Sequence, residues 1–194
     1  TLPTYPFQRK RYWFTPQSWT KPKQKTTDFS DWVYELNWQP IRTLKAQLPV
    51  HKQWLILGAD DDLSQKILAQ FSQATLVVFG ETNQISFERQ KWIVNPEKFA
   101  DFLTQLDLES IAGIIHCWSL LSVSQNIGLD KAQALICGTT LKLIQALYDQ
   151  KLAIPCWFVT RHSQKVLDND SVQGFAQGSL WGLAQAITLE HPEL

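Results

Sequence analysis

Apolar residues in this chain form short segments that alternate between the spacing of strands and the spacing of helices. Continuous apolar runs, typical of strands buried on both faces, predict strands over residues 53–57, 75–79, 92–94, 111–118 and 155–160. Apolar residues at helical spacing predict helices over 63–72, 97–106 and 130–150, and a final helix from Gln177 that ends at Pro192. Strands that alternate with helices predict an α/β fold, a Rossmann-like parallel sheet with helices on both faces.

The first 31 residues do not follow this pattern. Residues 1–14 alternate prolines, aromatic rings and cations, and the prolines favour an extended backbone. An extended strip cannot bury its own rings, so we expect it to wrap over another surface. Residues 15–31 are polar and contain two prolines, which predicts a linker. Residues 32–38 alternate like a half-buried strand and begin the domain that we predict over 32–194.

Composition adds little evidence for a charged partner or a membrane. The 194 residues carry a formal net charge of +0, with 44% hydrophobic and 19% charged residues. The short basic run Arg9–Arg11 lies among aromatic rings, but in a neutral chain it does not predict a nucleic-acid partner. No apolar run is long enough to cross a bilayer and no signal peptide occurs, so we expect a cytoplasmic protein without a membrane partner.

The cysteines indicate the redox state of the cell compartment, and two further features indicate whether the chain is part of a longer polypeptide. The cysteines are Cys117, Cys137 and Cys156, an odd number without the spacing of a disulfide framework, which predicts reduced, buried thiols. The sequence contains no Met and starts at Thr1, which favours an excised piece of a longer polypeptide.

The turn after the first predicted strand argues against a nucleotide. A dinucleotide-binding protein places further glycines after Gly58, so that the backbone can approach a pyrophosphate. Residues Asp60–Asp62 stand there instead. Aspartates can cap the helix that follows, but their carboxylates would repel a phosphate at close range. We therefore predict no cofactor-binding residues in this chain.

Sequence motifs for catalysis are also missing. None of the four tyrosines has a lysine four residues later, the pair that short-chain dehydrogenases use. No nucleophile elbow and no P-loop occur, and the four histidines lack the spacing of metal ligands.

Three groups of side chains could still carry chemistry. His116 and Cys117 stand at the carboxyl end of a predicted strand, but neighbours on a strand point to opposite faces and cannot pair. The run Asp60–Asp62 could attract a divalent cation, yet three consecutive aspartates cannot converge on one ion, so helix capping is preferred. Glu190 and His191 near the end of the last helix resemble an acid–base pair, but a helix-terminal histidine is commonly structural. We predict no catalytic residue and no metal ligand.

Six segments, in order along the chain, resemble modular type I polyketide synthases. Residues 2–13 (LPTYPFQRKRYW) are similar to the segment that closes the acyltransferase region, and 34–38 (YELNW) to the entry strand of the ketoreductase region. The other four resemble segments of that ketoreductase region: 114–120 (IIHCWSL), 141–147 (LKLIQAL), 156–161 (CWFVTR) and 179–194 (SLWGLAQAITLEHPEL). The chain departs from the family at His162, where glycine is usual, and at Ala184–Gln185, which replace Gly-Arg.

The resemblance implies the structural subdomain of a ketoreductase, a truncated Rossmann-like unit that does not react. In the family, NADPH and the active site belong to the catalytic subdomain that follows, which reduces a β-ketoacyl thioester on acyl carrier protein. The implied partners are this catalytic subdomain, the acyltransferase with its linker, and indirectly the acyl carrier protein. Two alternatives stay open: a pseudo-ketoreductase scaffold for a methyltransferase or enoyl reductase, and a free-standing NADP-dependent reductase. The missing glycine loop and Tyr/Lys pair disfavour the second.

The last predicted helix carries apolar side chains over more than one face: Trp181, Leu183, Ala184, Ile187 and Leu189. One face should pack on the sheet, with Trp181 in the core. The remainder should form an apolar patch that a second subdomain covers.

Overall fold

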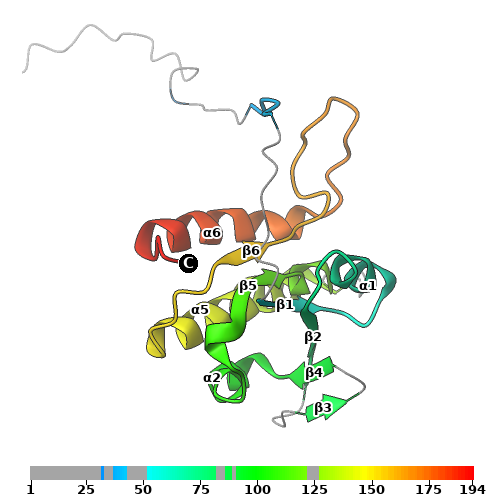
Figure 1. The fold of residues 1–194 in the computed structure, drawn as a ribbon. Coiled ribbons are helices and arrows are strands. Elements are labelled where there is room, and N and C mark those ends of the chain that lie inside the picture. Colours follow the sequence, from blue (N-terminus) through cyan, green and yellow to red (C-terminus); the bar gives the residue numbers. More distant parts are fainter. Residues whose placement is uncertain (1–31, 33–36, 43–51, 82–85, 89–90, 122–126) are drawn as a thin grey trace, which may run out of the picture. The chain divides into compact units, whose positions relative to one another are not determined.

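The computed structural model describes residues 32, 37–42, 52–81, 86–88, 91–121 and 127–194. The chain divides into two compact units, Thr1–Gln39 and Pro40–Leu194, and the second contains the described sheet and its helices (Figure 1). The predicted wrapping strip (1–14) and linker (15–31) lie outside the described residues, as does most of the predicted strand over 32–38. The domain boundaries therefore stay predictions.

A six-stranded sheet, in the order β3-β4-β2-β1-β5-β6, is the centre of the second unit. Its strands are β1 (Gln53–Gly58), β2 (Ala74–Phe79), β3 (Ser86–Glu88), β4 (Lys91–Val94), β5 (Ile111–His116) and β6 (Cys156–Phe158). All neighbouring pairs are parallel except β3 and β4, which are antiparallel. The predicted α/β class with a parallel sheet is confirmed, whereas the short edge strand β3 was not predicted.

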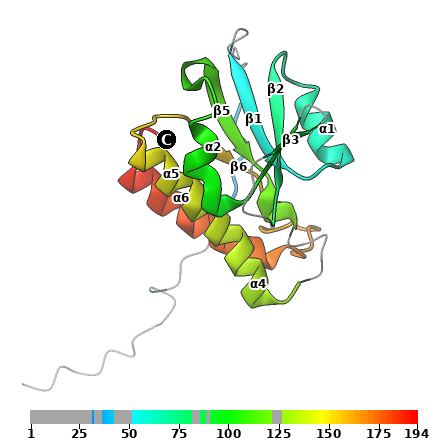
Figure 2. The same cartoon turned by 90° about the horizontal axis from the view of Figure 1, so that it is seen from below.

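Helices cover both faces of this sheet, as Figure 2 shows. They are α1 (Asp62–Leu68), α2 (Phe99–Leu103), α4 (Leu129–Gln133), α5 (Thr139–Asp149) and α6 (Gly178–Glu190). On one face, α1 packs over Trp54, Ile56 and Leu76. The other face carries the larger core, to which α2, α5 and Ile187 of α6 contribute. Between β2 and β4 the described residues form β3 and no helix, so the fold is a truncated Rossmann-like sheet.

Element bounds differ from the prediction where side chains turn into the core. Helix α1 ends at Leu68, four residues before the predicted end of the first helix. Phe71 lies beyond this end, and its ring packs on that of Trp54 with centroids 4.8 Å apart. Strand β5 ends at His116 because Trp118 folds inward and is completely buried. Its indole N–H is shared between the carbonyls of Gly58 and Val77, each 3.2 Å away. These bonds tie the end of β5 to β1 and β2.

The predicted long helix over 130–150 spans Leu129–Asp149 but contains a π-helical turn at Ala134–Gly138. Two threonines that follow this turn bond back to it. The Thr139 hydroxyl donates to the Leu135 carbonyl at 2.6 Å, and the Thr140 hydroxyl to the Ile136 carbonyl at 2.8 Å. Such turns interrupt the regular helical ladder, and here the turn brings Thr139 against His116.

The expectation that Trp181 lies in the core is wrong. Its side chain is 38% exposed, because the indole N–H reaches out to the hydroxyls of Thr160 (3.2 Å) and Ser163 (3.1 Å) in the loop after β6. Leu180 and Ile187 are the buried residues of α6 instead, and Leu189 is 84% exposed. The helix thus packs one face and leaves apolar side chains on another, as its sequence predicts.

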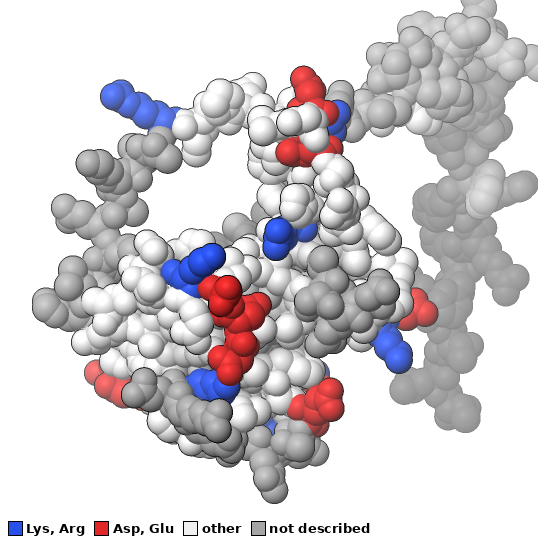
Figure 3. All heavy atoms as spheres, turned by 90° about the vertical axis from the view of Figure 1, so that its right-hand side faces the viewer, with Lys and Arg blue, Asp and Glu red and all other residues white. Residues whose placement is uncertain are grey.

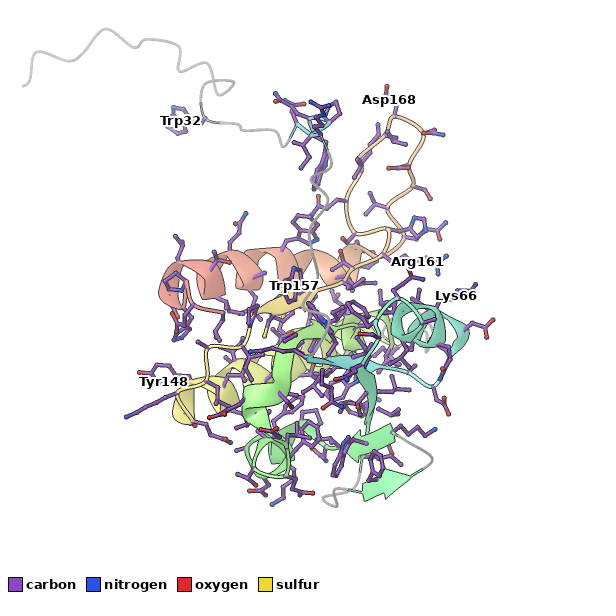
Figure 4. All side chains as sticks on the ribbon, viewed as in Figure 1. Trp32, Lys66, Tyr148, Trp157, Arg161 and Asp168 are labelled. Atoms are coloured by element: carbon purple, nitrogen blue, oxygen red, sulfur yellow. The ribbon has the colours of Figure 1, made fainter. Side chains whose placement is uncertain are left out.

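His162, one of the departures from the resembled pattern, has an unusual backbone conformation. His162 has a φ of 52°, in the left-handed region that favours glycine, the residue usual in the family at this place. The loop closes here through a hydrogen bond of 2.9 Å from the Gly174 N–H to the His162 carbonyl. A Cβ at position 174 would collide with the Arg161 carbonyl, so this close approach requires Gly174. Figure 4 labels Asp168, at the far end of the loop.

Candidate functional site at the carboxyl ends of the strands

In an open parallel sheet, ligands bind outside the carboxyl ends of the strands at the point where the strand order reverses. Here that point lies between β1 and β5, because β2 follows on one side of β1 and β5 lies on the other. A crevice of about 230 Å³ is found there. Its lining comes from the turn after β1, from α1, and from the ends of β5 and β6: Ala59, Asp61, Leu63, Ser64, Cys117, Leu120, Leu121 and Arg161.

The aspartates after β1 are engaged in the fold. A carboxylate oxygen of Asp61 accepts a hydrogen bond of 2.9 Å from the Ser64 N–H, so the predicted helix-capping role is confirmed for this residue. Asp60 forms an ion pair with Lys91 of β4. Asp62 lies in the first turn of α1. Within the described part of the chain, no cluster of three or more His, Cys, Asp or Glu residues could hold a metal ion.

Gly58 allows the close approach of α1 to the end of β1. A Cβ at this position would collide with the side chain of Ser64, which is buried against it. A side chain from α1 therefore packs directly against the backbone of Gly58, where a dinucleotide fold brings its pyrophosphate close. On the side of the molecule where α1 lies, Figure 3 shows a band of acidic side chains with basic side chains at both ends. With the Asp61 carboxylate at the turn, these residues do not fit a dinucleotide.

His116, the last residue of β5, is completely buried in the core. Its ring lies 5.7 Å from the rings of Trp118 and of Phe158. Its Nε2 is 3.4 Å from the Thr139 hydroxyl, whereas its Nδ1 has no hydrogen-bond partner among the described residues. Burial lowers the pKa of His116 from 6.5 to about 4. The imidazole is therefore neutral at pH 7 and packs as a core side chain.

Cys117 follows β5 and is not part of it, contrary to the predicted strand over 111–118. Its N–H donates to the Leu57 carbonyl at 2.7 Å, and its side chain lines the crevice. Burial, and secondly the charge of Asp61, raise the pKa of its thiol to about 12. The thiol is therefore protonated at neutral pH, and it lies in different surroundings from the neighbouring imidazole. This geometry gives no activated Cys–His nucleophile.

His191 makes structural contacts, as preferred over an acid–base pair with Glu190. His191 follows the end of α6, and its Nδ1 lies 3.4 Å from the carboxylate of Glu193. Its ring also packs on Tyr148 with centroids 5.0 Å apart. These contacts fasten the turn after α6 to the end of α5.

Arg161 is a residue that the sequence analysis missed. It stands just after β6, at the foot of the loop labelled in Figure 4, and lines the crevice. Its backbone N–H donates to the Gln177 side-chain oxygen at 2.9 Å, which holds the loop against the start of α6. Its position after a predicted strand, at the edge where ligands gather, was the signal that could have found it.

The fold and the crevice together define the class: a Rossmann-like α/β domain whose nucleotide turn is packed by its own side chains. No family model matches the sequence. The chain is 28% identical over 202 residues to the polyketide synthase GfsA of Streptomyces halstedii, a match covering 99% of this chain. It is 27% identical over 198 residues to the pikromycin polyketide synthase component PikAII of Streptomyces venezuelae, again over 99% of this chain. The chain spans only 3% and 5% of the lengths of these relatives.

Two solved structures are similar over most of the chain. An A-type ketoreductase from a modular polyketide synthase matches with a TM-score of 0.60 and 21% identity, over 81% of this chain and 32% of that one. A C2-type ketoreductase from a modular polyketide synthase matches with a TM-score of 0.51 and 25% identity, over 73% of this chain and 30% of that one. The homologues of this chain are therefore modular polyketide synthases, and its structure matches ketoreductase structures. No helix in the described ranges is long and apolar enough to cross a membrane.

Proposed function

We propose that this chain is the non-catalytic structural subdomain of a ketoreductase region in a polyketide synthase module. Its role is to support a catalytic subdomain that reduces a β-ketoacyl thioester carried by acyl carrier protein. The packing of the turn after β1 carries the proposal. Ser64 occupies the space beside Gly58, and the Asp61 carboxylate caps α1 where a pyrophosphate would bind. NADPH then belongs to the catalytic subdomain, and this chain contributes rigidity.

Exposed apolar side chains support a role as a scaffold. Trp157 on β6 is 48% exposed, and Phe175 and Leu189 near the two ends of α6 are also exposed. A contiguous apolar patch of this kind would mark a surface that another domain covers. The catalytic subdomain is the proposed partner of these apolar side chains, and the acyltransferase with its linker is the proposed partner at the amino-terminal end.

A free-standing NADP-dependent reductase would need the phosphate turn that Ser64 and Asp61 occupy. A pseudo-ketoreductase scaffold for a methyltransferase or enoyl reductase would share the packed turn. The reductase activity of the longer polypeptide separates this last alternative from the proposal.

A titration with NADPH tests the cofactor part of the proposal. When NADPH is added to the 194-residue chain at micromolar concentrations, we expect no saturable calorimetric signal, because the Ser64 side chain packs against Gly58 and the Asp61 carboxylate stands at the turn where a pyrophosphate would bind. A polypeptide extended through the catalytic subdomain is the positive control and should bind. Saturable binding to the shorter chain, with protection of residues 58–63 from hydrogen exchange, would contradict the proposal.

Substitutions in the crevice test for hidden chemistry. We expect Asp61→Ala and Cys117→Ala, made in the longer polypeptide, to keep kcat for reduction of a β-ketoacyl thioester within about threefold of the parent. A general acid or base contributes about 10²–10⁴-fold, so a catalytic role would be evident. Circular dichroism would verify folding, since loss of the Asp61 cap costs about 1 kcal/mol. A thousandfold loss in a folded variant would show that this chain takes part in the reaction.

A further inference from the structure

A second pocket, also of about 230 Å³, lies at the foot of the loop that joins β6 to α6. Its lining consists of Arg161, His162, Gln173 and Gly174, so two of these residues are basic and none is acidic. Arg161 lines the crevice described above as well, and the two hollows are therefore neighbours at the carboxyl edge of the sheet.

Gln177, beside this pocket, contains a buried hydrogen-bond donor without an acceptor. The residue is 0% exposed, and its Oε1 accepts from the Arg161 N–H at 2.9 Å. This bond fixes the orientation of the side-chain amide, because only its oxygen can accept. The Nε2 has no hydrogen-bond partner among the described residues. A Cβ on Gly174 would stand 3.1 Å from this Nε2, so the unused donor lies against the wall of the pocket.

Other donors at the foot of the loop are also unused. The backbone N–H groups of His162 and Ser163 form no hydrogen bond within the described part of the chain, and the side chain of Arg161 forms no ion pair there. His162 has a φ of 52°. A left-handed residue in a turn can direct successive N–H groups to one side, as in the backbone nests that bind anions.

The acidic side chains of the loop do not line the pocket. Asp168 lies at the far end of the loop, whereas Arg161 lies at its foot (Figure 4). Asp170 is close enough to His162 for their charges to interact. Its carboxylate, however, already accepts two backbone N–H groups of the loop, at 2.8 and 3.1 Å. The foot of the loop thus combines unpaired donors with basic side chains.

We infer that this pocket binds a small oxyanion of the size of phosphate or sulfate. A buried donor without a partner is unfavourable, and an oxyanion supplies the missing acceptors. Arginine matches such ions through paired N–H donors. The volume suits a single ion, since pockets for larger ligands span about 300–1,000 Å³. The bound ion would join the foot of the loop to the start of α6 and so stabilise the loop.

A titration with inorganic phosphate, followed by NMR of the ¹⁵N-labelled chain, tests this inference. With sodium chloride keeping the ionic strength constant, the side-chain amide of Gln177 and the backbone amides of His162 and Ser163 should shift saturably at millimolar phosphate. The side-chain amide of Gln133 donates to the Ala176 carbonyl at 3.0 Å and is the internal control that should not move. A Gln177 side-chain amide that stays unchanged throughout the titration would overturn the inference.

Two variants with the same change of charge show whether binding is specific to the pocket. Arg161→Gln should weaken phosphate binding about tenfold or more, because charge-assisted hydrogen bonds are lost. The backbone bond from Arg161 to Gln177 remains, so the loop should keep its fold. Lys165→Gln removes a charge from an exposed residue of the loop that does not line the pocket, and it should change the affinity less than about twofold. Equal affinities of the two variants would contradict the inference.

Thermal unfolding gives a second readout. Phosphate should raise the melting temperature of the parent and of Lys165→Gln more than that of Arg161→Gln, since a ligand stabilises the state that binds it. A general salting effect of phosphate would raise all three equally and would count against the site. The inference does not depend on the proposed function, because neither the scaffold role nor the NADPH titration involves this pocket.

Discussion

Replacing Trp118 by alanine is expected to lower the free energy of unfolding by about 3–5 kcal/mol, the usual cost of removing a large buried ring. The ring is completely buried, stacks on Phe99 at 5.3 Å and meets the edge of Phe79 at 5.6 Å. Its indole N–H also donates hydrogen bonds to the carbonyls of Gly58 and Val77. Alanine would leave a cavity where three strands end. Urea unfolding followed by circular dichroism measures the loss.

Two variants sharpen this prediction. Trp118→Phe keeps most of the volume but loses the indole N–H, so we expect an intermediate loss of about 1–3 kcal/mol. Trp181→Ala is the matched control, because this indole is 38% exposed and its hydrogen bonds lie in a surface loop. It should cost about 1 kcal/mol, the typical value for a single substitution. Equal losses at positions 118 and 181 would show that Trp118 does not anchor the core.

Acid is expected to destabilise the chain through His116. An unfolded histidine binds a proton below its ordinary pKa of 6.5, whereas buried His116 does so only below about 4. Between these values the unfolded state binds more protons, so the free energy of unfolding falls as the pH falls. The full effect is about 3 kcal/mol, since one pKa unit corresponds to about 1.4 kcal/mol. This loss of stability is absent well above pH 6.5, the ordinary pKa of histidine, and is complete below pH 4, the lowered pKa of His116.

The measurement compares the free energies of unfolding at neutral and at acid pH in the parent chain and in the variants His116→Phe and His191→Gln. His116→Phe replaces the imidazole by a ring that can pack between Trp118 and Phe158, and it should remove about 3 kcal/mol of the acid loss. His191→Gln changes a histidine that is not buried and should keep the loss. An identical pH dependence in the parent and in His116→Phe would contradict the assignment.

Much of the candidate site was accessible to sequence reasoning because it depends on neighbours along the chain. An aspartate three residues before the amide that it caps is a local contact, so the role of Asp61 could be predicted from the acidic turn. Arg161 and Ser64 were missed, since their part in the crevice depends on where β6 and α1 bring them. The argument on Cys117 assumed that it lay on a strand, but β5 ends one residue earlier, where Trp118 turns inward.

The sequence by itself determined the class of the fold and the order of its main elements. Strands covered on both faces need continuous apolar runs, and α1, α5 and α6 need apolar residues at helical spacing, so both kinds of element are visible without a structure. Only the tertiary structure decided where Trp118 and Trp181 go. Both are tryptophans beside apolar residues, but one indole finds carbonyls on two buried strands and the other finds hydroxyls in a surface loop. These partners lie 18 to 60 residues away along the chain, and a local sequence pattern does not predict contacts between residues so far apart in sequence.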